Sequence, residues 1–221
     1  MNVLAVSAHP DDETLGCGGT LLKHRAAGDK LFWVIATVCH EPQWPAAVIE
    51  RKAAEVDRVA AAYEAQPFKL GFLNARLDTV PVGDLMRPIE TLVDDIKPEI
   101  VYLLHGGDIH TDHHALSIAM MSVLKPFYMM RRGVRRVLGY ETLSSTDAAP
   151  PGAGRMFVPN VFSDITPYLE RKLDIMRLYE TEIQAEPMPR SPSAIRALAR
   201  FRGSTINTEY AEAFALIREL I

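Results

Sequence analysis

Short apolar runs alternate with helix-like segments over the first 140 residues of this 221-residue chain. Strand-like, mostly apolar runs occupy residues 2–8, 31–38, 68–73, 100–104 and 137–140. Helix-like segments lie between them, at residues 18–28, 45–65, 82–96 and 113–131. Because continuous apolar strands separated by helices are typical of a parallel sheet covered on both faces, we predict a doubly wound α/β fold. The sheet is expected to be mostly parallel and flanked by helices.

The C-terminal part of the chain differs in composition, and Pro and Gly residues are frequent shortly after residue 143. The elements expected there are a loop, a short strand and three helices, at residues 144–159, 161–165, 167–184, 193–202 and 208–220. Neither an internal repeat nor a linker separates this part from the rest. The chain is therefore predicted to be one domain over 1–221, with a core at 1–143 and a C-terminal cap at 144–221.

Composition excludes several classes of protein. The hydrophobic fraction of 48% and the charged fraction of 24% are ordinary for a globular domain. A net charge of -4, with only a short arginine cluster at 131–136, argues against a nucleic-acid-binding protein. Two cysteines, Cys17 and Cys39, are too few for a disulfide framework and favour a reducing compartment. Because signal-peptide features and a run long enough for a membrane span are both lacking, we expect a cytoplasmic protein.

The stretch Ala8-His9-Pro10-Asp11-Asp12-Glu13 combines one imidazole with three carboxylates directly after the first apolar run. Charged groups near a core are costly unless they are paired or bind a metal. Glu13 is expected at the start of the following segment, where its charge is solvated or stabilises the turn. This composition, at the carboxyl end of a predicted strand, favours a metal site.

A second cluster, His110-Thr111-Asp112-His113-His114, follows the fourth predicted strand by a few residues. Ligands of doubly wound sheets bind outside the carboxyl ends of the strands, so both clusters are expected at one crevice. Three histidines and an aspartate within five positions again have the composition of a metal site.

The stretches at 8–13 and 110–114 resemble the PIG-L/LmbE family of metal-dependent de-N-acetylases of amino sugars. Weaker matches in the C-terminal part are at 141–142, 159–162, 202–203 and 210–214. The resemblance implies a Rossmann-like fold. It also implies a hydrolase that removes the N-acetyl group from a GlcNAc-type conjugate, releasing acetate and a free amine.

The resemblance implies that His9, Asp12 and His113 are the protein ligands of one divalent metal. Calcium and magnesium prefer all-oxygen ligand shells, so the mixed set argues against them. Zinc suits two imidazoles and one carboxylate with open positions, and Fe²⁺ is the alternative.

By the same resemblance, Asp11 is the general base that activates the attacking water. His110, as an imidazolium, would stabilise the oxyanion and protonate the leaving amine. Asp112 would pair with His110 and favour its charged form. The alternative for Asp112 is a helix N-cap, with the helix beginning near His114. His114 itself is expected to pack or to lie at the surface.

The resemblance also implies that Arg51 contacts hydroxyl or phosphate groups of the substrate, with a solvated helix charge as the alternative. Asp78, after the third predicted strand, is a second candidate, for a sugar hydroxyl. The glycine-rich stretch 16–19 lacks the full dinucleotide spacing. It is expected to allow close approach of the backbone to the metal-binding loop. Cys17 is expected to be a small buried residue.

Two other functions are compatible with this pattern. One is an amidase of the same site with a substrate other than an acetylated sugar. The other is a non-catalytic, metal-containing sugar-binding module. Asp11 and His110 favour catalysis, because binding alone needs neither a base nor an acid. The expected partners are a small amino-sugar conjugate and further copies of the chain, and loops 40–46, 74–82 and 144–158 are expected to select the conjugate.

Overall fold

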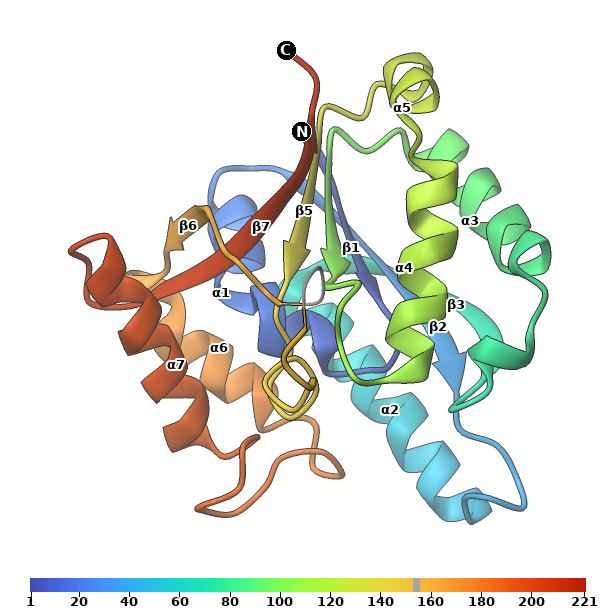
Figure 1. Ribbon diagram of the computed structural model, residues 1–221. Coiled ribbons are helices and arrows are strands. Elements are labelled where there is room, and N and C mark those ends of the chain that lie inside the picture. The colour runs from blue at the N-terminus through green and yellow to red at the C-terminus, as the bar shows by residue number, and fades with distance from the viewer. Residues whose placement is uncertain (153–155) are drawn as a thin grey trace.

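The computed structural model describes residues 1–152 and 156–221, which form a sheet with the strand order β3-β2-β1-β4-β5-β7-β6 (Figure 1). In chain order the strands are β1 (Asn2–Ser7), β2 (Lys30–Val38), β3 (Ala65–Leu73), β4 (Ile100–Leu104), β5 (Arg136–Tyr140), β6 (Val161–Asp164) and β7 (Ala211–Glu219). Neighbours among the first five strands are parallel, whereas β7 runs antiparallel to β5 and β6. The predicted α/β fold with a mostly parallel sheet is confirmed.

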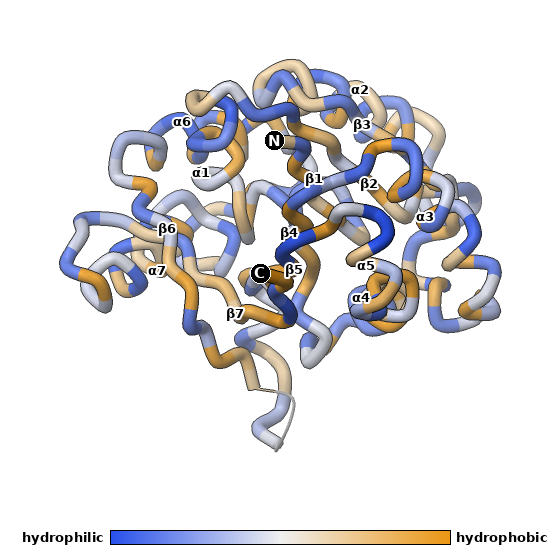
Figure 2. The backbone as a smooth tube through the Cα atoms, turned by 90° about the horizontal axis from the view of Figure 1, so that it is seen from above, coloured by the Kyte–Doolittle hydropathy of each residue, from blue (hydrophilic) through white to orange (hydrophobic). Residues whose placement is uncertain are grey.

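Helices cover both faces of this sheet. They are α1 (Asp12–Ala26), α2 (Ala46–Tyr63), α3 (Val82–Ile96), α4 (Thr111–Val123), α5 (Pro126–Arg132), α6 (Leu169–Met176) and α7 (Pro192–Thr205), with short 3-10 turns η1 (Leu77–Thr79) and η2 (Thr166–Tyr168). Helix α1 packs against α6 on one side, and α3 packs against α4 on the other (Figure 2). Among the described residues, no helix combines the length and apolar character needed to cross a membrane.

The central strand β1 is buried, and its register with β4 brings two loops together. Residues 3–6 of β1 are at most 1% exposed. Strand β1 pairs with β4 in parallel from Val3↔Ile100 to Val6↔Leu103. The loops that leave these two strands therefore emerge side by side at one edge of the sheet.

The C-terminal part departs most from the sequence-based prediction. The helix predicted over 208–220 is wrong, because this segment is strand β7. Its sequence is rich in the helix formers Ala, Glu and Leu, but it bonds to β5 on one side and β6 on the other. Sheet pairing and burial of residues 211–214 thus override local helix propensity.

Three helix boundaries also differ from the prediction. Helix α1 begins at Asp12, six residues before the predicted start at 18. The segment predicted as one helix over 113–131 is divided into α4 and α5, with Pro126 opening α5. The amphipathic helix predicted over 167–184 is helical only to Met176, and turns follow it. Residues 153–155 of the predicted loop lie outside the described residues.

A buried ion pair joins the C-terminal part to α1. Lys172 of α6 and Glu212 of β7 are 2.7 Å apart, and each is at most 4% exposed. Glu212 also accepts hydrogen bonds from the backbone of Gly19 and Thr20, and Lys172 donates to the carbonyl of Leu15. Residues 161–219 thus complete the sheet and hold the helix that starts at the first acidic cluster.

Candidate functional site

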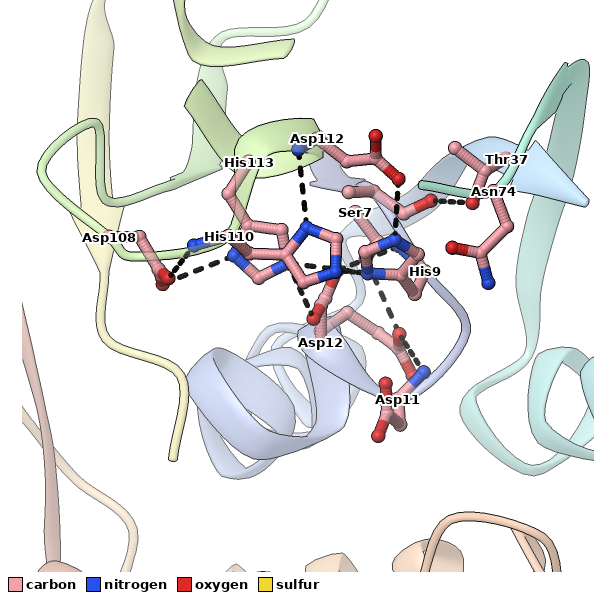
Figure 3. A network of polar contacts seen from close by, with 12 residues as sticks. Ser7, His9, Asp11, Asp12, Thr37, Asn74, Asp108, His110, Asp112 and His113 are labelled. Carbon is pink, nitrogen blue, oxygen red and sulfur yellow. Dashed lines mark hydrogen bonds and ion pairs between the residues drawn. The ribbon is translucent and has the colours of Figure 1, made fainter. Parts of the chain in front are cut away.

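A cavity of about 330 Å³ opens at the carboxyl ends of β1 and β4. Both predicted clusters contribute to its wall, through His9, Asp11, Asp12, His110 and His113. Other parts of the chain complete the wall, including Cys39, Trp44, Lys52, Asn74, Thr142, Ser144, Glu182 and Arg190. The polar side chains at its floor form one connected network (Figure 3).

The backbone separates the two adjacent aspartates. Asp11 lies in the left-handed region at φ 112°, immediately before helix α1 begins at Asp12. Asp12 accepts a hydrogen bond from the backbone N–H of His9 (2.8 Å), which folds its carboxylate back under the imidazole. The Asp11 carboxylate instead contacts Arg190, at 3.1 Å. One carboxylate thus faces the histidines while its neighbour is kept apart from them.

Contacts with carboxylates indicate the tautomers of two histidines, through a hydrogen bond for His9 and an ion-pair contact for His113. His9 Nε2 lies 2.9 Å from Asp112, and His113 Nδ1 lies 3.1 Å from Asp108, so these nitrogens carry the protons. The other nitrogens, His9 Nδ1 and His113 Nε2, face each other at 3.3 Å. Asp12 lies 3.8 Å from the first and 3.5 Å from the second. Two lone pairs and a carboxylate converging on one point repel each other, and a cation between them removes that repulsion.

His110 is held differently. Its Nδ1 accepts a hydrogen bond from the backbone N–H of Asp112 (3.2 Å), so the proton of the neutral ring is on Nε2. Burial, together with the nearby rings of His9 and His113, lowers the pKa of His110 to about 4. This shift is opposite in direction to the one that the predicted imidazolium of His110 requires, because the half-buried ring lies beside two other imidazoles.

The predicted pairing of Asp112 with His110 is wrong. The Asp112 carboxylate binds His9 and accepts backbone N–H groups from Ala75 (2.7 Å) and Leu77 (2.9 Å). Burial acts to raise the pKa of Asp112, but these hydrogen bonds lower it below its usual value. The N-cap of α4 is His110, so the alternative of an Asp112 cap is wrong as well.

Glu13 is fully buried, contrary to the expectation of a solvated charge. Its carboxyl group accepts hydrogen bonds from Thr14 (2.6 Å) and from Tyr179 (2.7 Å), which follows α6. Burial raises the pKa of Glu13 to about 7, although these bonds oppose the shift. Glu13 thus anchors the start of α1 to the C-terminal part of the chain.

The family model described as PIG-L, GlcNAc-PI de-N-acetylase, matches residues 4–124, more than half of the chain. The chain belongs to the PIG-L family. An uncharacterized deacetylase of Escherichia coli is 27% identical over 168 residues, which cover 74% of this chain and 81% of that protein.

Solved structures extend the likeness in fold to nearly the whole chain. The N,N'-diacetylchitobiose deacetylase of Pyrococcus horikoshii has a TM-score of 0.77 at 18% identity, covering 98% of this chain and 83% of that one. A 4-carboxy-2-hydroxymuconate hydratase of Pseudomonas putida has a TM-score of 0.74 at 17% identity, covering 100% of this chain and 97% of that one. Proteins of one fold thus catalyse different reactions, so the reaction of this PIG-L family member depends on its site and not on its fold.

Most of the predicted site residues lie together in this PIG-L family member. His9, Asp11, Asp12, His110 and His113 line the cavity, and Asp112 lies directly behind His9. The two predicted substrate-binding residues lie elsewhere. Arg51 is exposed, and the next residue, Lys52, lines the cavity in its place. Asp78 is exposed in η1, beside a separate pocket that His114 also lines.

Sequence reasoning missed several wall residues, above all Glu182 and Arg190. Glu182 lies at the end of the helix predicted over 167–184, and Arg190 lies between that helix and the next predicted one. No periodicity or motif marks either residue. Asp108 was also missed, although its position in the loop after the fourth strand, two residues before His110, pointed to the same crevice.

Proposed function

We propose that this chain is a metal-dependent hydrolase that removes the N-acetyl group from a GlcNAc-type amino-sugar conjugate. The observation that carries the proposal is the separation of roles at the cavity floor. His9 Nδ1, His113 Nε2 and the Asp12 carboxylate converge on one point, while the neighbouring Asp11 is turned towards Arg190. Membership of the PIG-L family and the N-acetyl-sugar deacetylase among its structural neighbours support this reaction.

The metal ligands we propose are His9, Asp12 and His113. One nitrogen from each of His9, His110 and His113 lies within 4.8 Å of the others, but the tautomer of His110 turns its lone pair to the backbone. Two imidazoles and a carboxylate suit zinc, with Fe²⁺ as the alternative. Such a metal polarises the amide carbonyl and makes water a stronger nucleophile at neutral pH.

The protein's own groups would then move the protons. Asp11 takes a proton from the attacking water and returns it to the leaving amine. Burial raises the pKa of Asp11 well above its usual value, with Asp12 and Glu182 adding to the shift and Arg190 opposing it. His110, as a neutral ring, donates its Nε2–H to the oxyanion that forms from the carbonyl oxygen.

A second candidate reaction is hydrolysis of an amide with a longer acyl chain. A smaller cavity of about 110 Å³ lies between β2 and α2, lined by apolar side chains that include Ile35, Val38, Ile49, Ala53 and Val56. It shares Pro10, Cys39, Lys52 and Asn74 with the main cavity. An alkyl chain therefore has an apolar space adjoining the reacting groups.

The test is acetate release from a panel of N-acetylglucosamine conjugates by the zinc- or iron-loaded protein, with butyryl and hexanoyl analogues in parallel. Failure on all acetyl conjugates would refute the proposed reaction, and preference for the longer chains would favour the second candidate. Asp11→Asn should lower kcat by about 10²–10⁴-fold with metal content unchanged, because it removes only the base. Asp57→Asn, which breaks an exposed pair with Lys69, serves as the control and should leave kcat unchanged.

Both cysteines are free thiols, Cys17 buried and Cys39 half-buried. These thiols are compatible with the reducing, cytoplasmic location that we propose. Assembly into a homo-oligomer and the substrate-binding roles of Arg51 and Asp78 stay predictions.

A further inference from the structure

The Asp11 carboxylate depends on a distant residue for its orientation. Asp11 precedes α1 with a left-handed backbone, so the regular geometry of the helix does not direct its side chain. The hydrogen bond that its carboxylate accepts comes from Arg190 Nη1, 179 residues further along the chain. Among the residues that the structure describes, one hydrogen bond, from a cation, thus holds this carboxylate in its direction.

Arg190 is itself held in place from two directions. Its backbone N–H donates to Gln184 Oε1 (3.1 Å), and the Gln184 N–H donates to the Arg190 carbonyl (3.3 Å). These reciprocal bonds close the loop that carries the guanidinium. The loop is fixed to α2 by Thr181, whose N–H and hydroxyl donate to the buried Glu55 at 3.1 and 2.8 Å.

The guanidinium is also restrained at its tip. Arg190 Nη1 donates to Glu182 at 2.8 Å, and Glu182 forms an ion pair with Lys52 of α2. Lys52, Glu182, Arg190 and Asp11 therefore form a chain of alternating charge along the cavity wall. With two carboxylates on one nitrogen, Arg190 has little freedom to turn away from Asp11 and engage an anionic substrate.

We propose that Arg190 is a positioning residue that holds the Asp11 carboxylate at the angle from which it transfers protons. The inference rests on the proposed function, in which Asp11 is the base. Proton transfer requires hydrogen-bond distance and direction, and a misplacement of about 1 Å costs up to about 10²-fold in rate. Glu182 and Lys52 support this position, because they restrain the other side of the same guanidinium.

The test is steady-state kinetics of Arg190→Ala, Arg190→Lys and Glu182→Gln in the metal-loaded protein, with the metal content of each measured. Arg190→Ala should lower kcat by about 10–100-fold with KM and metal content within about twofold of wild type. Added guanidinium, far below unfolding concentrations, should restore part of kcat in Arg190→Ala. Arg190→Lys should retain an intermediate kcat, and Glu182→Gln should lose less than Arg190→Ala.

Arg177→Ala is the matched control, since it removes an arginine–carboxylate pair (Arg177–Asp174) whose partners are half exposed and that does not line the cavity. Unchanged kcat in Arg190→Ala would overturn the inference. So would a change confined to KM, which would make Arg190 a substrate-binding residue. A loss accompanied by loss of metal, with no recovery in guanidinium or in Arg190→Lys, would reduce Arg190 to a structural role. If wild type itself releases no acetate, the proposed function is refuted, and the positioning role of Arg190, which rests on it, is refuted with it.

Discussion

At the scale of single residues, Asp112 determines which nitrogen of His9 is available to a metal. Its carboxylate binds His9 Nε2 at 2.9 Å and leaves Nδ1 unprotonated towards His113. Asp108 does the same for His113, at 3.1 Å. A carboxylate behind a metal-binding imidazole fixes the orientation of the ring and raises its basicity.

Asp112→Asn should therefore weaken metal binding by about 10–100-fold. The carboxylate oxygens accept hydrogen bonds from three donors, which are His9 Nε2–H and the backbone N–H groups of Ala75 and Leu77. The amide of asparagine has a similar size, but its NH₂ group would face at least one of these donors and could not accept its hydrogen bond. Competition with a chromogenic chelator measures the affinity. Asp95→Asn, at an exposed position of α3, should bind metal like wild type. Equal affinities in both variants would contradict the role assigned to Asp112.

The sequence predicted the residues of the cavity floor better than it predicted the side chains with which they form hydrogen bonds. Motif spacing and the convergence of strand ends placed His9, Asp12 and His113 at one crevice, because both depend on local pattern and on the parallel sheet. Side-chain partners depend on angles that no spacing encodes, so Asp112 was assigned to the wrong histidine. Arg190 reaches Asp11 across 179 residues, and no local pattern marks such a contact.

At the scale of elements, helix α1 approaches the sheet more closely than a helix with side chains on that face could. A Cβ on Gly16 would lie 2.0 Å from Cδ2 of the buried Tyr140 ring. That ring is fixed by its hydroxyl, which donates to the Val6 carbonyl at 2.8 Å. The glycines at 16, 18 and 19 thus allow close approach to the side chains of Tyr140, Tyr63 and Ile165, and the predicted approach to the metal-binding loop is wrong.

Gly16→Ala should destabilise the protein by about 1–3 kcal/mol, because the ring or the helix must shift. Urea unfolding measures the loss. Gly83→Ala is the matched control on α3, since a Cβ there meets nothing within 4 Å, and it should leave stability unchanged or raise it by about 0.5–1 kcal/mol. Similar unfolding midpoints for wild type and Gly16→Ala would show that α1 has room to move.

Glu13 makes the attachment of α1 sensitive to pH. Its folded-state pKa of about 7 exceeds the ordinary value of 4.5, so the folded protein holds this proton more tightly than the unfolded chain. The resulting stability is fully present below about pH 4.5 and is lost as pH rises through about 7. Glu13→Gln keeps an acceptor for Thr14 and Tyr179 but has no charge to bury.

We therefore expect the fall in Tm between pH 5 and about pH 7.5 to be smaller in Glu13→Gln than in wild type. Thermal melts in a chelator, at several pH values, measure this difference without a contribution from metal occupancy. Other carboxyl groups titrate in both proteins, and subtraction removes their effect. Parallel Tm curves for the two proteins would mean that Glu13 keeps an ordinary pKa in the folded state.

At the scale of the whole molecule, the elements of the first 140 residues matched the sequence-based prediction in type and order, apart from the start of α1 and the division into α4 and α5, because each parallel strand and its helix carry their own periodicity. The C-terminal part did not, because β7 is a strand only through its partners β5 and β6. The same long-range pairing brings residues 169–212 against α1, through Lys172, Tyr179 and Glu212. The wall of the cavity thus has two parts. The part from the first 140 residues follows from local sequence patterns, and the C-terminal part follows from tertiary contacts.

A metal at the cavity floor would join segments a hundred residues apart, because His9 and Asp12 flank the start of α1 while His113 lies in α4. Zinc or Fe²⁺ should therefore raise Tm, and a chelator should lower it again. At a metal concentration 100 times Kd, binding stabilises by about 2.7 kcal/mol, which is on the order of 5–10 °C for a chain of this size. His113→Ala should abolish this shift, whereas His114→Ala, one residue further along the same helix and lining another pocket, should retain it. A shift that survives in His113→Ala would mean that the metal binds elsewhere, and the ligand set proposed for the cavity would then fail.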